Sequence, residues 1–154
     1  NNDAGTKAVL KDGWLFTGDL ACMDEKGFIY ITVRQKNVIV TKNGKNIFPE
    51  EVEAYINKSP YILESLVTGK DDEETGETIV SAQIVPDMDA IKAKLKTDSE
   101  PSAEVVYKLI KAEIKSINKN MPIYKRVIDI NIRETEFAKT TTKKIKRYLE
   151  KTHV

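Results

Sequence analysis

Apolar and polar positions alternate in several short runs along the chain, and the spacing of these runs predicts its elements. Residues 28–33 alternate regularly, which is typical of a strand, and a second strand-like run begins at Val38. Between the two runs lies a polar stretch, Arg34-Gln35-Lys36-Asn37. A charged stretch between two β-branched runs is most often a solvated turn.

The chain after residue 37 has the pattern of a complete small domain. Asn43-Gly44 between apolar runs predicts a hairpin, and Pro49 suits the first position of a helix. Val52, Tyr55 and Ile56 are expected on the apolar face of that helix. Further along we expect strands at 61–69 and 78–85, a short helix at 87–97 with Ile91 and Leu95 inward, and a strand at 127–132. A longer helix is expected between the short helix and the last strand, with Ser99 and Ser102 as candidate N-caps and an end near Asn118–Asn120. This order predicts an α+β domain with a short mixed sheet flanked by helices.

The first 35 residues contain one unusual phrase, Gly13-Trp14-Leu15-Phe16-Thr17-Gly18-Asp19. Glycine lets the backbone approach a ligand closely, and an adjacent Asp can accept hydrogen bonds from a sugar diol. The alternative is a β-turn in which Asp19 bonds local backbone N–H groups. Residues 24–27 then predict a hairpin turn.

The last third of the chain is rich in lysine. Lysines of the long helix, among them Lys115, are expected on its solvated face. Near the C-terminus, the cations of 136–147 flank three threonines, an arrangement that could cradle phosphate oxygens. The alternative is a basic tail that is disordered or loosely helical.

Composition excludes several classes of protein. The chain is 40% hydrophobic and 32% charged, which fits a globular protein. Its formal net charge of +1 creates no overall electrostatic attraction to nucleic acid. Its single cysteine, Cys22, fits a reducing cytosolic compartment. No run is long enough to span a bilayer, and one histidine, His153, gives no basis for a zinc site. Because the chain opens on Asn1 rather than Met, we expect a larger N-terminal region in the natural protein.

These phrases, in this order, resemble the C-terminal portion of AMP-forming acyl-CoA synthetases, the adenylate-forming superfamily. The resemblance covers nearly the whole chain from about Thr6 and is closest to the long-chain fatty-acid–CoA ligase branch. The phrases that carry it are Gly13-Trp14 with Thr17-Gly18-Asp19, then Arg34-Gln35-Lys36, then Gly44 to Glu53, and finally Phe137 to Arg147. The resemblance implies that residues 1–35 end a large AMP-binding domain as a β-hairpin remnant, and that residues 36–154 form a mobile lid domain.

The resemblance also implies roles for five residues. Lys144 would be the catalytic lysine of adenylation, and Asp19 and Arg34 would hold the ribose of ATP and of the acyl-adenylate. Lys36 would be the hinge, and Gly44 would lie on the loop that lines the CoA path. The implied reaction converts fatty acid, ATP and CoA to acyl-CoA, AMP and pyrophosphate, with Mg bound mainly by the missing domain.

Two positions depart from the family pattern. Val33 stands where the family usually has Gly before the hinge arginine. Lys143 stands where the lysine motif usually has Gly before its catalytic lysine, which adds a Cβ where backbone freedom is expected. Lys143 could therefore compete with Lys144 for the catalytic role.

Two alternatives to a CoA ligase stay open at this point. One is an adenylating ligase that loads a carrier protein, and the other is a stand-alone, non-catalytic interaction module derived from the same domain. For the CoA ligase we expect a cytoplasmic location and an isolated chain without activity. The resemblance gives no nucleic-acid partner and leaves peripheral membrane contact open.

Overall fold

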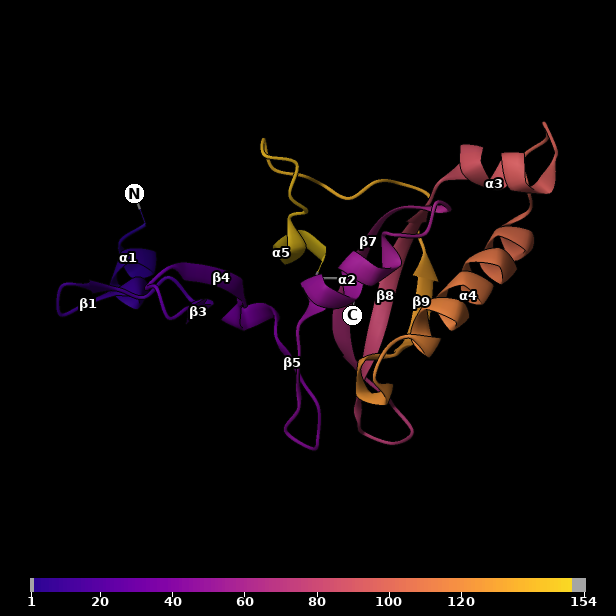
Figure 1. Cartoon of the computed structure of the whole chain (residues 1–154). Coiled ribbons are helices and arrows are strands. Elements are labelled where there is room, and N and C mark those ends of the chain that lie inside the picture. Colours follow the sequence, from indigo (N-terminus) through magenta and orange to yellow (C-terminus); the bar gives the residue numbers. More distant parts are fainter. Residues whose placement is uncertain (1, 151–154) are drawn as a thin grey trace. The chain divides into compact units, whose positions relative to one another are not determined.

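The computed structural model describes residues 2–150 (Figure 1). The chain divides into two compact units, Asn1–Val38 and Ile39–Val154. The boundary predicted between residues 35 and 36 falls in the short 3-10 helix η1, Gln35–Asn37, just before this division. The assignment of the two parts to a large domain and a lid stays a prediction.

The first unit consists of short elements that bury very little. Its elements are α1 (Asp3–Val9), β1 (Leu10–Lys11), β2 (Trp14–Leu15), β3 (Asp19–Met23) and β4 (Ile29–Arg34). β1 pairs with β2 and β3 with β4, both antiparallel. The predicted turn between β3 and β4 is confirmed, since the Asp24 carboxylate accepts the N–H groups of Lys26 and Phe28, both at 2.9 Å. Helix α1 has no buried residue, so no apolar pattern could have predicted it.

The second unit is built on a three-stranded sheet. Its larger elements are α2 (Pro49–Ile56), β7 (Ile62–Asp71), β8 (Thr78–Pro86), α3 (Met88–Leu95), α4 (Ala103–Lys119) and β9 (Val127–Ile132). The smaller elements are β5 (Ile39–Val40), β6 (Asn46–Ile47), the 3-10 helix η2 (Ile123–Lys125) and α5 (Arg147–Glu150). β8 is central, antiparallel to β7 and parallel to β9, so the predicted mixed sheet is confirmed.

The main core lies between one face of this sheet and helices α2 and α4. Ile56 and Ile110 from the helices and Ala82 and Ile84 from β8 are all fully buried there. Two predictions of inward side chains were wrong. Tyr55 is 38% exposed and Leu95 is 39% exposed, because α2 and α3 are two-turn helices that bury narrower stripes than predicted.

A second, smaller core forms on the opposite face of the sheet. It contains Leu66, Val85 and Phe137, with Ile145 packed partly against it. Leu66 precedes Val67 and Val85 follows Ile84, both residues of the main core, and successive residues of a strand point to opposite faces. The segment after β9 is therefore packed on the sheet, and the alternative of a disordered basic tail is wrong for the part up to residue 150.

Candidate functional site

Lys144 lies at the end of a tight hairpin. The Thr140 N–H donates to the Lys144 carbonyl at 2.8 Å, and the Lys144 N–H donates to the Thr140 hydroxyl at 3.2 Å. The Lys143 N–H closes the turn on the Thr140 carbonyl at 2.9 Å. Lys143 has a positive φ of 61°, the left-handed conformation that favours glycine. Lys144 is exposed, so its position is fixed through its backbone while its ammonium group projects into solvent.

Gly44 lies in a hairpin with the same bonding pattern. The Thr41 N–H donates to the Lys45 carbonyl at 3.0 Å, and the Lys45 N–H donates to the Thr41 hydroxyl at 3.1 Å. The Gly44 N–H closes the turn on the Thr41 carbonyl at 2.8 Å, and Gly44 has φ 73°. The predicted Asn-Gly hairpin is confirmed. We call these segments the Gly44 hairpin (41–45) and the lysine hairpin (140–144).

The two hairpins lie near opposite ends of the β7–β8 pair. Phe137, just before the lysine hairpin, packs on Val85 near the end of β8, and its N–H donates to Glu64 near the beginning of β7. The Gly44 hairpin borders the other end of the pair, where Thr78 begins β8. Figure 1 shows the same arrangement, with the loop after β5 and the loop before α5 extending in opposite directions. One compact unit therefore presents the two loops at separate places.

A partly buried ion pair joins the lysine hairpin to the helix that follows the Gly44 hairpin. The Arg147 guanidinium bonds the Glu53 carboxylate on α2 and donates to the Val67 carbonyl at 3.2 Å. Glu53 also accepts the Val67 N–H at 2.6 Å, and Glu50 lies 3.6 Å from the guanidinium. Burial raises the pKa of Glu53, and the hydrogen bond from Arg147 opposes that rise. Arg147, three residues after Lys144, thus anchors the lysine hairpin to α2 and β7.

A second anchor lies on the other side of the lysine hairpin. Glu64 is nearly buried, accepts the Phe137 N–H at 2.8 Å and pairs with Lys139 at 2.8 Å. Lys139 also pairs with Glu136 at 2.7 Å, and these hydrogen bonds, that of Glu136 first, raise the pKa of Lys139. Lys139 is therefore engaged in ion pairs with two carboxylates, and in this it differs from the exposed lysines of the hairpin.

In the first unit the structure brings together the two residues predicted to hold a ribose. Asp19 and Arg34 are cross-strand partners, and the Arg34 Nε lies 2.8 Å from the Asp19 carboxylate. Arg34 also donates to the Thr17 carbonyl at 3.2 Å, and Gly18 has φ 72°. The pair shares one edge of a hairpin and could present a carboxylate and a guanidinium to the same sugar. Lys36 lies two residues further on, in η1.

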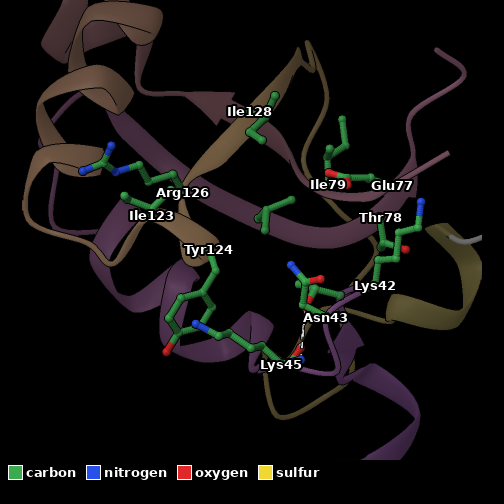
Figure 2. Close-up of a pocket in the computed structure, with 12 residues that line it drawn as sticks. Lys42, Asn43, Lys45, Glu77, Thr78, Ile79, Ile123, Tyr124, Arg126 and Ile128 are labelled. Atoms are coloured by element: carbon green, nitrogen blue, oxygen red, sulfur yellow. Dashed lines mark hydrogen bonds between the residues drawn. The ribbon is translucent and has the colours of Figure 1, made fainter. Parts of the chain in front are cut away.

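A groove of about 370 Å³ opens beside the Gly44 hairpin (Figure 2). Lys42 and Lys45 line it from the hairpin and Tyr124 from η2, with the Lys45 ammonium 4.6 Å from the centre of the Tyr124 ring. Arg126 adds a third cation, and Glu77 is the one acid among the lining residues. Cations beside an exposed aromatic ring suit a ligand with phosphate and a planar base. Sequence reasoning missed this groove because its parts are separate in the chain.

Within residues 2–150, no group of three or more His, Cys, Asp or Glu side chains is gathered in a way that could hold a metal ion. None of the helices that the structure describes is long and apolar enough to cross a membrane.

Comparison with known proteins assigns the second unit to a family. The family model for the AMP-binding enzyme C-terminal domain matches residues 36–151. The chain belongs to this family. The match begins inside η1, at the position where the hinge was predicted. The recognition of the chain as the C-terminal portion of an adenylate-forming acyl-CoA synthetase is confirmed.

Relatives of the chain include acyl-CoA ligases that are named for fatty acids of different chain length. A long-chain-fatty-acid–CoA ligase from Bacillus subtilis is 45% identical over 100 residues, covering 65% of this chain and 17% of that protein. A medium/long-chain-fatty-acid–CoA ligase from Mycobacterium tuberculosis is 38% identical over 126 residues, covering 82% and 21%. The chain thus spans about a fifth of the length of these relatives.

A solved structure supports the fold. O-succinylbenzoate coenzyme A synthetase from Bacillus subtilis, in complex with ATP and magnesium ion, superimposes with a TM-score of 0.67 at 25% identity. The match covers 98% of this chain and 27% of that one. The roles of Asp19, Arg34, Lys36, Gly44 and Lys144 are tested by none of these comparisons and stay predictions.

Proposed function

We propose that the chain supplies the mobile lid of an AMP-forming long-chain fatty-acid–CoA ligase and acts in both of its half-reactions. The observation that carries this proposal is the placement of two like hairpins at opposite ends of one compact unit. Two loops fixed at separate places cannot serve one substrate at the same time. A rotation of the unit about a hinge at Lys36 would present them in turn.

Lys144 is proposed to act in adenylation. The fatty carboxylate attacks the α-phosphorus of ATP, and the bond to pyrophosphate breaks. Two anions must approach each other, and an ammonium group between them stabilises the charge that develops in the transition state. Lys144 is one of two exposed lysines, with Lys143, in a hairpin held at both flanks, by Arg147 and by Phe137. Asp19 and Arg34 are proposed to hold the ribose of ATP and of the adenylate.

The Gly44 hairpin and its groove are proposed to act in thioester formation. The CoA thiolate attacks the acyl carbonyl of the adenylate and expels AMP. Gly44 has no side chain to obstruct a narrow pantetheine arm, and Lys42, Lys45 and Tyr124 would contact the nucleotide end of CoA. Because a carrier protein has the same pantetheine arm, comparing free CoA with a carrier protein as acceptor separates the two kinds of ligase.

A chimera tests the catalytic assignment. Residues 36–151 of this chain would replace the matching segment of the Bacillus subtilis long-chain ligase, to which the chain is 45% identical over 100 residues. Lys144→Ala should lower ATP–pyrophosphate exchange by roughly 10²–10³, since it removes a preorganised transition-state charge. Lys143→Ala is the matched control and should leave exchange within a few-fold.

Unchanged exchange in the Lys144→Ala chimera would contradict the assignment, and a loss confined to Lys143→Ala would transfer the role to Lys143. The 154-residue chain by itself is expected to form neither acyl-adenylate nor acyl-CoA. A cytoplasmic location is part of the proposal.

A further inference from the structure

One face of the second unit is cationic and adjoins the groove beside the Gly44 hairpin. A groove of about 400 Å³ runs between α4 and β9, and four cations line it: Lys111, Lys115, Lys119 and Arg126. No acid is among the residues that line this groove. The carboxylates of α4 are engaged elsewhere, since Glu104 pairs with Lys108 at 2.6 Å and Glu113 accepts from Ser59 at 3.3 Å.

Two aliphatic side chains project beside these cations. Ile123 in η2 is 78% exposed and Ile128 in β9 is 65% exposed, the highest values of any large aliphatic residue that the structure describes in the second unit. Ile128 and Arg126 line both this groove and the groove beside the Gly44 hairpin, and Ile123 lines the latter. The isoleucines and the cations therefore form one continuous surface, which we call the Lys–Ile face (Lys111, Lys115, Lys119, Ile123, Arg126, Ile128).

We propose that the Lys–Ile face docks the protein on an anionic phospholipid bilayer. Exposed aliphatic side chains enter the interfacial region of a bilayer, and adjacent lysines bind headgroup phosphates while their alkyl stems stay on apolar surface. Charge complementarity selects an anionic surface, and the two isoleucines favour a bilayer over a soluble polyanion. The inference goes beyond the proposed ligase reaction and does not depend on the acyl group.

Vesicle sedimentation of the 154-residue chain tests the proposal. Vesicles of equal parts phosphatidylcholine and phosphatidylglycerol should bind the chain, vesicles of phosphatidylcholine alone should bind it much less, and added salt should release it. Lys115→Glu with Lys119→Glu should lower the partition coefficient about tenfold or more. Ile123→Ser with Ile128→Ser should weaken binding as well, with far-UV circular dichroism showing that each variant stays folded.

Matched controls separate this face from other apolar and basic surfaces. Lys108→Glu changes a lysine of the same helix outside the groove, and Ile29→Ser with Ile31→Ser removes two exposed isoleucines of the first unit. Both variants should bind like the unchanged chain. The single tryptophan, Trp14, lies in the first unit, so its emission should not shift when vesicles are added.

Three results would overturn the proposal. One is full binding by the Lys115→Glu, Lys119→Glu variant. Another is loss of binding in the Ile29→Ser, Ile31→Ser variant with a blue shift of Trp14, which would assign the contact to the first unit. The third is release of the chain by CoA or by a short DNA duplex at phosphate concentrations well below that of the accessible lipid, which would identify a site for a soluble polyanion. No enzymatic activity is measured, so these results are independent of the ligase assignment.

Discussion

Lys143 and Gly44 occupy equivalent positions in two hairpins with the same hydrogen-bond pattern. Both have positive φ, 61° and 73°, but only one of them is glycine. A left-handed backbone costs a residue with a Cβ roughly 1–2 kcal/mol. The departure noted in the sequence at Lys143 therefore stores strain next to the proposed catalytic lysine, and the fold keeps the glycine-like conformation despite it.

Reciprocal substitutions at these positions should have opposite effects on stability. Lys143→Gly is expected to raise the free energy of unfolding by about 1 kcal/mol, because the strain is relieved. Gly44→Ala is expected to lower it by about the same amount; a Cβ at Gly44 meets no atom within 4 Å, so only the backbone resists it. Urea unfolding of the two variants measures both changes. A destabilised Lys143→Gly variant would show that the lysine side chain itself supports the hairpin.

Glu53 should give the stability of the second unit a distinctive pH dependence. Burial raises the pKa of its carboxyl in the folded state, so between the unfolded and folded pKa values the folded chain holds the proton more often. Its contribution is therefore fully present below the unfolded pKa and is lost as pH rises through the folded pKa. The contribution of Asp72 to stability has the opposite pH dependence, because backbone hydrogen bonds, led by that of Thr75, lower the pKa of its carboxyl.

The difference in unfolding free energy between the unchanged chain and the Glu53→Gln variant should fall as pH rises from the acidic range to neutrality. Urea unfolding at a series of pH values measures this difference. Asp72→Asn is the control, for which the corresponding difference should rise with pH. A flat profile for Glu53→Gln would mean that the Arg147 guanidinium cancels the effect of burial.

At the scale of elements, Arg147 connects parts that are far apart in the sequence. It follows the lysine hairpin and reaches Glu53 in α2 and the Val67 carbonyl in β7. Arg147→Met should lower the free energy of unfolding by about 3 kcal/mol, since it leaves the Glu53 carboxylate buried without its cation. The Arg147→Met, Glu53→Gln double variant should lose less than the two single variants together.

Amide hydrogen exchange of residues 139–146 shows whether Arg147 holds the lysine hairpin in place. If Arg147 anchors the hairpin, exchange there should accelerate in Arg147→Met more than in Phe137→Leu, a variant that loosens the other flank while keeping an apolar side chain. A double variant that loses the sum of the two single losses, with unchanged exchange, would reduce Arg147 to an ordinary surface residue.

The elements of the second unit were predictable because each is determined by a local pattern. The Asn-Gly hairpin, Pro49 at the beginning of α2 and the apolar stripe of α4 each depend on neighbouring residues. What could not be predicted depends on partners distant in the chain. The groove at Tyr124 and the anchor of Arg147 need the tertiary fold, and Tyr55 was assigned inward because periodicity does not give the width of the covered stripe.

The site residues show the same division. The motifs located Asp19, Arg34, Gly44 and Lys144 along the chain, and the structure adds that the first two form a pair. The positive φ at Lys143 was expected only from the usual glycine at that position. Short motifs identify the groups that do chemistry, whereas the residues that hold them in place are scattered through the fold.

At the scale of the whole molecule, the two units differ in how much apolar surface each buries within itself. The second unit has its own buried core, whereas in the described part of the first unit only Val33 is buried. Trp14 and Ile31 are 75% and 72% exposed, and a two-stranded hairpin alone is marginally stable. In the proposed ligase this apolar surface would be covered by the rest of the large domain, with η1 as the connection to the lid.

Restricting the connection should separate the two half-reactions. Lys36→Pro fixes φ at residue 36 and restricts Gln35 before it, which limits the dihedral changes that a hinge in η1 must absorb. In a chimera that carries residues 1–151 of this chain, ATP–pyrophosphate exchange should persist within a few-fold, while acyl-CoA formation falls by roughly 10² because the Gly44 hairpin no longer reaches the adenylate. Lys36→Ala, which keeps the backbone free, is the matched control and should spare both reactions. Equal loss of both steps in Lys36→Pro, or a similar loss in Lys36→Ala, would place the function of Lys36 in its side chain and not in a hinge.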